Sequence, residues 1–153
     1  ILIGQSMGGV IANEIHKHSA IILIGQSMGG VIANEIHKHG WDNIQMMITI
    51  GSPLHGARLL NTLESVLPSW IRDTLYKIPY DDLKNKERAE PPPHAYKTIS
   101  MAWPFLEFDG CVYKDESCFE QRHHTHLSWA DHRTIFMNPR LWIIVHRLIA
   151  DNQ

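Results

Sequence analysis

The sequence predicts an α/β fold in which a mostly parallel sheet is flanked by helices. Residues 20–24 and 44–50 are short, continuous apolar runs, typical of parallel strands that are buried on both faces. Between them, residues 28–39 repeat apolar side chains at helical spacing, with polar ones elsewhere. A strand, a helix and a strand in this order predict a parallel βαβ unit.

Three further signals extend this order of elements. Gly40 is a typical helix stop after the basic last turn of the first predicted helix. Residues 96–101 form a third predicted strand. Asn138 and Pro139 predict a second helix, with Asn as the cap and Pro at the first helical position, and this helix extends to about residue 150.

Length and composition favour one domain spanning residues 1–153. The chain is 44% hydrophobic and 20% charged, as soluble globular proteins are, and its net charge of −2 argues against a nucleic-acid partner. No apolar run reaches the roughly 18 residues of a membrane span, and no signal peptide is visible. The localisation stays open between the cytoplasm and the endoplasmic reticulum.

An exact internal repeat is the most unusual feature of the chain. Residues 1–18 recur unchanged at 22–39, and two copies are too few for a solenoid. We favour the second copy as the working one, because a fuller strand precedes it and the next strand follows it directly. Residues 1–21 then form an extra strand–helix unit, a displaced helix or a frayed end.

Residues 57–94 differ in character from the segments on either side. Apolar residues at helical spacing come first, followed by a charged run and three consecutive prolines at 91–93. The charged run predicts a solvated surface and the prolines predict a stiff connector. The apolar part is either a lid or cap inserted over a lipid site or ordinary packing, and both interpretations stay open.

The strongest chemical signal is a Gly-x-Ser-x-Gly pattern at residues 25–29, with Ser27 at its centre. A predicted strand precedes it and a predicted helix follows it, which is the context that a nucleophile elbow requires. Such a serine projects above the sheet from a strained turn, and the backbone amide of the next residue, Met28, faces the developing oxyanion. Ser6 holds the same place in the first copy and is the alternative nucleophile.

A serine hydroxyl needs a base to take its proton, and that base is normally a histidine oriented by a carboxylate. Asp109 lies just past the third predicted strand, where a loop at the carboxyl edge of the sheet belongs. Glu107 and Asp115 compete with it. We favour Asp109 as the acid of a Ser–Asp–His triad.

His132, shortly before the last helix, is the favoured base, and His126 is the alternative. The histidines at 123, 124 and 126 raise the question of a metal. No Cys or carboxylate spacing supports a closed site, so we expect surface histidines and no metal. Cys111 and Cys118 could form a small disulfide loop or stay as two thiols.

Taken together, four segments resemble lipase-type α/β-hydrolases, and most resemble the glycosylphosphatidylinositol inositol-deacylase (PGAP1-like) group. The resemblance implies an α/β-hydrolase fold over about residues 20–150. It also implies a Ser27–Asp109–His132 triad and a lipid or glycolipid ester as substrate, with no cofactor. The segments are the elbow at 25–29, Ile-Thr-Ile-Gly-Ser-Pro-Leu-His-Gly at 48–56, Asp109-Gly110 and Asp131-His132.

One departure from the family affects the expected activity. The family has several strands and an oxyanion loop before the elbow, whereas only 26 residues precede Ser27 here. We therefore expect a fold that is incomplete at the N-terminus. The function classes are a serine esterase or lipase, an inert hydrolase fragment or interaction module, and an acyltransferase or thioesterase with the same triad. Peripheral contact with a membrane and the oligomeric state are left open.

Overall fold

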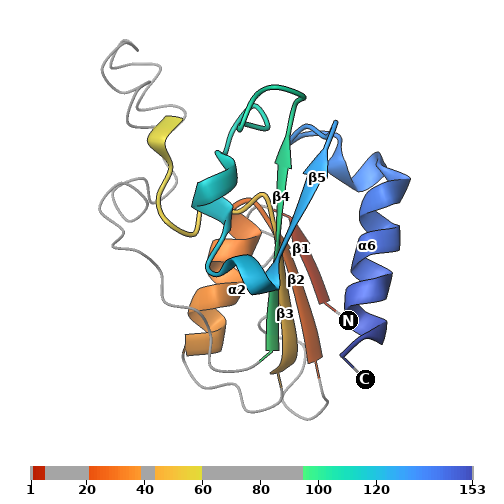
Figure 1. Cartoon of the computed structure of the whole chain (residues 1–153). Coiled ribbons are helices and arrows are strands. Elements are labelled where there is room, and N and C mark those ends of the chain that lie inside the picture. Colours follow the sequence, from red (N-terminus) through yellow and green to blue (C-terminus); the bar gives the residue numbers. More distant parts are fainter. Residues whose placement is uncertain (1, 6–20, 39–43, 60–94, 153) are drawn as a thin grey trace.

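A computed structural model describes residues 2–5, 21–38, 44–59 and 95–152. The strands form one sheet, in which each neighbouring pair is parallel and the spatial order follows the chain (Figure 1). All carboxyl ends therefore lie along one edge, at the top of the view. The strands are β1 (Leu2–Gln5), β2 (Ile21–Gln26), β3 (Ile44–Ile50), β4 (Ala95–Ala102) and β5 (His124–Ser128).

In the part of the chain that the structure describes, two helices cover opposite faces of this sheet, α2 (Met28–Lys38) and α6 (Pro139–Ala150) (Figure 1). Alternate strand residues feed two buried apolar clusters, because successive side chains point to opposite faces. Ile24 and Ile48 pack with Leu141 of α6, while Leu23 and Met47 pack on the other face with Ala33 of α2. None of the helices in the described ranges is long and apolar enough to cross a membrane.

The predicted α/β order is confirmed where local signals are strong. Strand β3 and helix α6 have the predicted bounds, and the Asn138 side chain accepts a hydrogen bond from the Arg140 N–H at 3.0 Å, as a cap does. Strand β2 continues two residues further than predicted, to Gln26. Three short 3-10 helices occupy the loops: η1 (Lys114–Ser117), η2 (Gln121–His123) and η3 (Ile135–Met137).

The duplicated segment adds a strand to the sheet. Strand β1 pairs with β2 in parallel, and every residue faces its own copy, from Leu2 with Leu23 to Gln5 with Gln26. Three arrangements were expected for the first copy, and the structure describes only its strand, β1. Residues 6–20 and most of the predicted lid, residues 60–94, lie outside the described residues.

Strand β5 was not predicted, and the expectation of surface histidines is wrong for His124. That ring is half-buried between two hydroxyls of β4: Thr98 Oγ1 lies 2.7 Å from Nδ1, and Ser100 Oγ lies 2.9 Å from Nε2. His126 is exposed, as expected, but it also contacts Ser100 Oγ, at 2.9 Å from Nδ1. The polar side chains of β5 form hydrogen bonds with β4. The strand therefore lacks the apolar run from which a buried strand is predicted.

Helix α2 lies close to β2 and to the segment after β3 because two glycines lack side chains. A Cβ added to Gly25 would lie 2.4 Å from the carbonyl oxygen of Gly29, well inside van der Waals contact. A Cβ on Gly30 would lie 2.0 Å from Ser52 Oγ and 2.7 Å from Ser52 Cβ. The position of the helix therefore depends on glycine at both sites.

The first prediction concerns pH. Burial, together with the positive charges of His126 and Lys114, lowers the pKa of His124 from its ordinary 6.5 to about 4. The unfolded chain therefore binds more protons between these values, so the free energy of unfolding should fall as pH drops from 6.5 towards 4. Urea denaturation across this range should show a flatter pH dependence in His124→Gln.

His146→Gln is the matched control, since His146 is exposed on α6. It should leave the pH dependence as in the parent protein. An unchanged slope in His124→Gln would show that His124 does not stay neutral in the fold.

The second prediction concerns the contact between α2 and Ser52. Gly30→Ala should destabilise the protein by about 1–3 kcal/mol, the usual cost of overpacking a buried site. Ser52→Gly removes the two nearest atoms that the new methyl group would meet and leaves the Gly25 carbonyl oxygen at 3.1 Å, so the double variant should recover part of the loss. Urea denaturation of both single variants and the double variant measures the coupling. Additive losses would contradict this account of the packing.

Candidate active site

Ser27 lies in the turn between β2 and α2, as expected for a nucleophile elbow. Its φ is +56°, a left-handed conformation that costs a non-glycine residue on the order of 1 kcal/mol or more. Two backbone hydrogen bonds hold it there: the Ser27 N–H donates to the Ile50 carbonyl at 3.0 Å, and the Gly30 N–H donates to the Ser27 carbonyl at 3.1 Å. The turn is thus tied to the end of β3 and to the first turn of α2.

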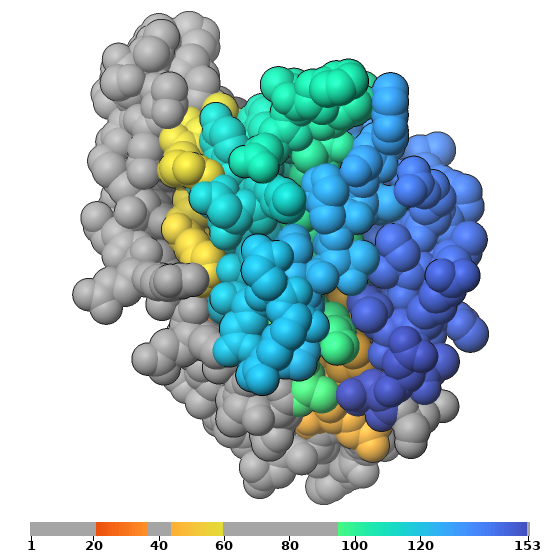
Figure 2. All heavy atoms as spheres, viewed as in Figure 1, coloured from red at the N-terminus to blue at the C-terminus, as the bar shows by residue number. Residues whose placement is uncertain are grey.

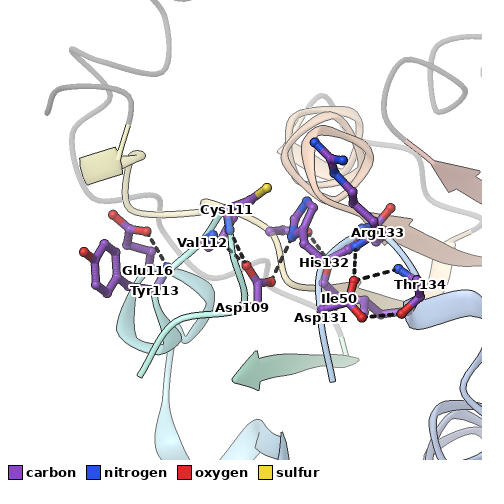
Figure 3. Close-up of polar contacts among 12 residues, drawn as sticks. Ile50, Asp109, Cys111, Val112, Tyr113, Glu116, Asp131, His132, Arg133 and Thr134 are labelled. Atoms are coloured by element: carbon purple, nitrogen blue, oxygen red, sulfur yellow. Dashed lines mark hydrogen bonds and ion pairs between the residues drawn. The ribbon is translucent and has the colours of Figure 1, made fainter. Parts of the chain in front are cut away.

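Asp109 lies in the loop after β4, and only 1% of its surface is exposed. One carboxylate oxygen, Oδ1, accepts hydrogen bonds from the backbone N–H groups of Cys111 at 2.8 Å and Val112 at 2.7 Å. The other, Oδ2, lies 2.8 Å from Nδ1 of His132 (Figure 3). The side chain therefore shapes its own loop and also orients an imidazole ring.

His132 lies in the loop between β5 and α6, and its side chain is 11% exposed. A carboxylate has only acceptors to offer, so the proton on Nδ1 must point to Asp109, and in the neutral tautomer of the ring Nε2 is then an acceptor. The His132 N–H also donates to the Asp109 carbonyl at 3.0 Å. The pair is thus joined through both side chain and backbone.

Gln26 connects this pair to the elbow. Its side-chain amide nitrogen, Nε2, donates to the His132 carbonyl at 2.8 Å, and Gln26 is the residue before Ser27. The sequence analysis missed this contact, which joins residues 106 positions apart. The available signal was a polar residue at the end of a buried apolar run.

Gly51, directly after β3, allows the pair to lie against the sheet. Its φ is +50°, and an added Cβ would lie 2.3 Å from Met101 Cε, 3.0 Å from Asp109 Oδ2 and 3.5 Å from His132 Nδ1. A side chain would therefore occupy the space that the Asp109–His132 pair needs. Gly51 was quoted only as part of the family-like segment, although a glycine that follows a strand is a known signal for close backbone approach.

The competing candidates lie in other contacts. Asp115 forms an exposed ion pair with Arg58, and Glu107 is exposed. His126 contacts Ser100 on β4, and Ser6 lies outside the described residues. Of the predicted acids and bases, the structure brings together Asp109 and His132.

Two further statements hold for the described residues. Within them, no group of three or more His, Cys, Asp or Glu side chains is arranged to hold a metal ion. No disulfide joins Cys111 to Cys118. Burial, followed by the nearby charge of Asp109, raises the pKa of the Cys111 thiol, which disfavours the reactive thiolate.

Exposed apolar side chains lie in the loops that carry Asp109 and His132. Trp103, Phe105 and Leu106 follow β4, and Trp129 follows β5; their exposed fractions are 49%, 104%, 57% and 68%. The two loops are adjacent, because the Trp129 N–H donates to the Ala102 carbonyl at 3.0 Å. They protrude at the top of the molecule in Figure 2.

Part of the chain is similar to one family of known proteins. Residues 13–68 match the family described as "PGAP1-like alpha/beta domain", a range that contains Ser27 and not Ser6. The comparison with curated protein sequences gives no significant match.

Two solved structures share the fold, both of the Bacillus licheniformis lipase BlEst2. The mature form aligns with a TM-score of 0.60 and 19% identity, covering 94% of this chain and 72% of that chain. The propeptide form aligns with a TM-score of 0.64 and 20% identity, covering 94% of this chain and 39% of that one. The chain is thus an α/β-hydrolase-fold protein, and its residues 13–68 are similar to the PGAP1-like family.

Proposed function

We propose that this protein is a serine ester hydrolase with Ser27 as nucleophile, His132 as base and Asp109 as the acid that orients the base. The observation that carries the proposal is the 2.8 Å contact between Asp109 Oδ2 and His132 Nδ1, beside a strained serine turn. A serine, a carboxylate and an imidazole occur in the chain order that this fold uses.

The chemistry follows from the arrangement of protons. His132 Nε2 takes the proton of Ser27 Oγ as this oxygen attacks the ester carbonyl carbon. The negative charge that forms on the carbonyl oxygen is stabilised by the Met28 N–H at the start of α2. His132 then returns the proton to the leaving alcohol, and an acyl group remains on Ser27. A water molecule, activated by His132, releases the acid in the second half of the cycle.

Three observations support Ser27 over Ser6 as the nucleophile. Strand β2, which leads into Ser27, lies between β1 and β3, and the Ser27 turn is hydrogen-bonded to the end of β3. Gln26 also links this strand to His132. In addition, the family match includes residue 27 but begins after residue 6.

A lipid-like acyl ester is the substrate class that the surroundings favour. The exposed Trp103, Phe105 and Trp129 offer apolar surface next to the loops of the acid and the base. The structural neighbours are described as a lipase. The PGAP1-like match extends the proposal to an acyl ester on the inositol of a glycolipid. We further propose one hydrolase domain over residues 1–153.

The third prediction tests the nucleophile. A fluorophosphonate probe should form a covalent adduct on Ser27, located by peptide mapping, and Ser27→Ala should abolish labelling and esterase activity. Ser6→Ala is the matched control, because its sequence surroundings are identical, and it should retain both. A folded protein that does not react with the probe would instead favour an inert hydrolase fragment.

The fourth prediction tests the acid. Asp109→Asn keeps an oxygen for the two backbone N–H groups but presents an amide to His132, which forces the wrong imidazole tautomer. Activity on a p-nitrophenyl ester should fall by about 10⁴, the loss that the corresponding change causes in a serine protease. Asp115→Asn should leave activity within about twofold, as expected when an exposed ion pair is removed. Equal losses in both variants would contradict the role of Asp109.

A further inference from the structure

Gln26 is a buried polar side chain that takes no part in the chemistry proposed above. Only 2% of its surface is exposed, and it shares a face of β2 with Ile24, which packs in the core beneath α6. A polar group in such a place is costly unless it is hydrogen-bonded. Its amide meets that requirement at one specific acceptor, the carbonyl of His132.

With that contact, the backbone of His132 is hydrogen-bonded on both sides of its α-carbon. On one side, the His132 N–H donates to the Asp109 carbonyl at 3.0 Å. On the other, the His132 carbonyl accepts from Gln26 Nε2 at 2.8 Å. The ring itself is held by Asp109 Oδ2. Two of these three hydrogen bonds connect His132 to Asp109. The third, from Gln26, connects it to β2, the strand that leads into Ser27.

The hydrogen bond between Gln26 and His132 matters because His132 belongs to a loop rather than to a strand or helix. Proton transfer requires the base within about 3 Å of the hydroxyl, and a displacement of about 1 Å can reduce the rate on the order of 10²-fold. Gln26 precedes Ser27 in the chain, so any movement of the elbow also moves the group that holds His132.

We propose that Gln26 is a positioning residue for the base: its buried amide couples the His132 backbone to the Ser27 elbow. The inference rests on the proposed function for its catalytic meaning. Its structural part concerns the position of the His132 ring and is measurable without any substrate.

Gln26→Met tests the proposal, because methionine is of similar length and shape but lacks a hydrogen-bond donor. On a p-nitrophenyl ester, kcat should fall roughly 10- to 100-fold while KM stays within about twofold, because the contact affects the base and not substrate binding. Gln26→Leu is a second donor-free variant, in case the first fails to fold. Gln5→Met is the matched control: it changes the same residue in the duplicated segment and should keep the parent kcat.

NMR provides a readout that does not depend on activity. The Nδ1 proton of His132, hydrogen-bonded to Asp109, should give a downfield resonance in the parent protein and in Gln5→Met. In Gln26→Met this resonance should shift, or broaden because its proton exchanges faster. The melting temperature of the variant should show that it is still folded. An unchanged resonance together with an unchanged kcat would overturn the proposal.

The two proposals fail in different ways. If the parent protein neither hydrolyses esters nor reacts with the fluorophosphonate probe, the proposed function fails. The resonance of His132 in Gln26→Met then still decides whether Gln26 positions the ring. If the parent protein is active and Gln26→Met loses kcat with an unperturbed His132 resonance, the hydrolase stands and the positioning role is wrong.

Discussion

The parallel pairing of β2, β3, β4 and β5 is the constraint on which the site depends. Because neighbouring strands run in one direction, their carboxyl ends meet along one edge, and the loops that follow them lie together. Ser27, Gly51, Asp109 and His132 each follow a different strand of this set. Residues spread over about a hundred positions are therefore adjacent without a long-range signal between them. A single antiparallel strand would move its loop to the opposite edge.

Within that edge, Asp109 links local folding to the orientation of His132. Its two carboxylate oxygens have separate partners, one in its own turn and one on the imidazole, so neither bond weakens the other. The turn is closed by a further bond from the Asp109 N–H to the Val112 carbonyl at 3.2 Å. A carboxylate anchored in this way has little freedom to rotate, and its hydrogen bond restricts the orientation of the imidazole ring.

How much could be predicted depended on whether the signal was local. Helix α6 could be predicted from Asn138 and Pro139, and β3 from its apolar run, because both signals depend only on residues that are neighbours in the sequence. Strand β5 could not, since His124 is stabilised by hydroxyls from another strand. In the candidate site, the elbow pattern and the chain order of acid and base led to Asp109 and His132. Gln26 could be recognised as a polar residue at the end of an apolar run, but its partner could not be found, because nothing in one sequence points to an acceptor 106 positions away.

The pairing of β1 with its own copy bears on how such a fold tolerates a repeat in its chain. The copied segment enters the sheet beside its original and in the same register, at the side away from β3, β4 and β5. Insertion of the same residues between β2 and β3 would have separated the elbow from its neighbours. Among the described strands, a duplicated strand can thus join a parallel sheet beside its own copy while the pairing of β2, β3, β4 and β5 stays the same.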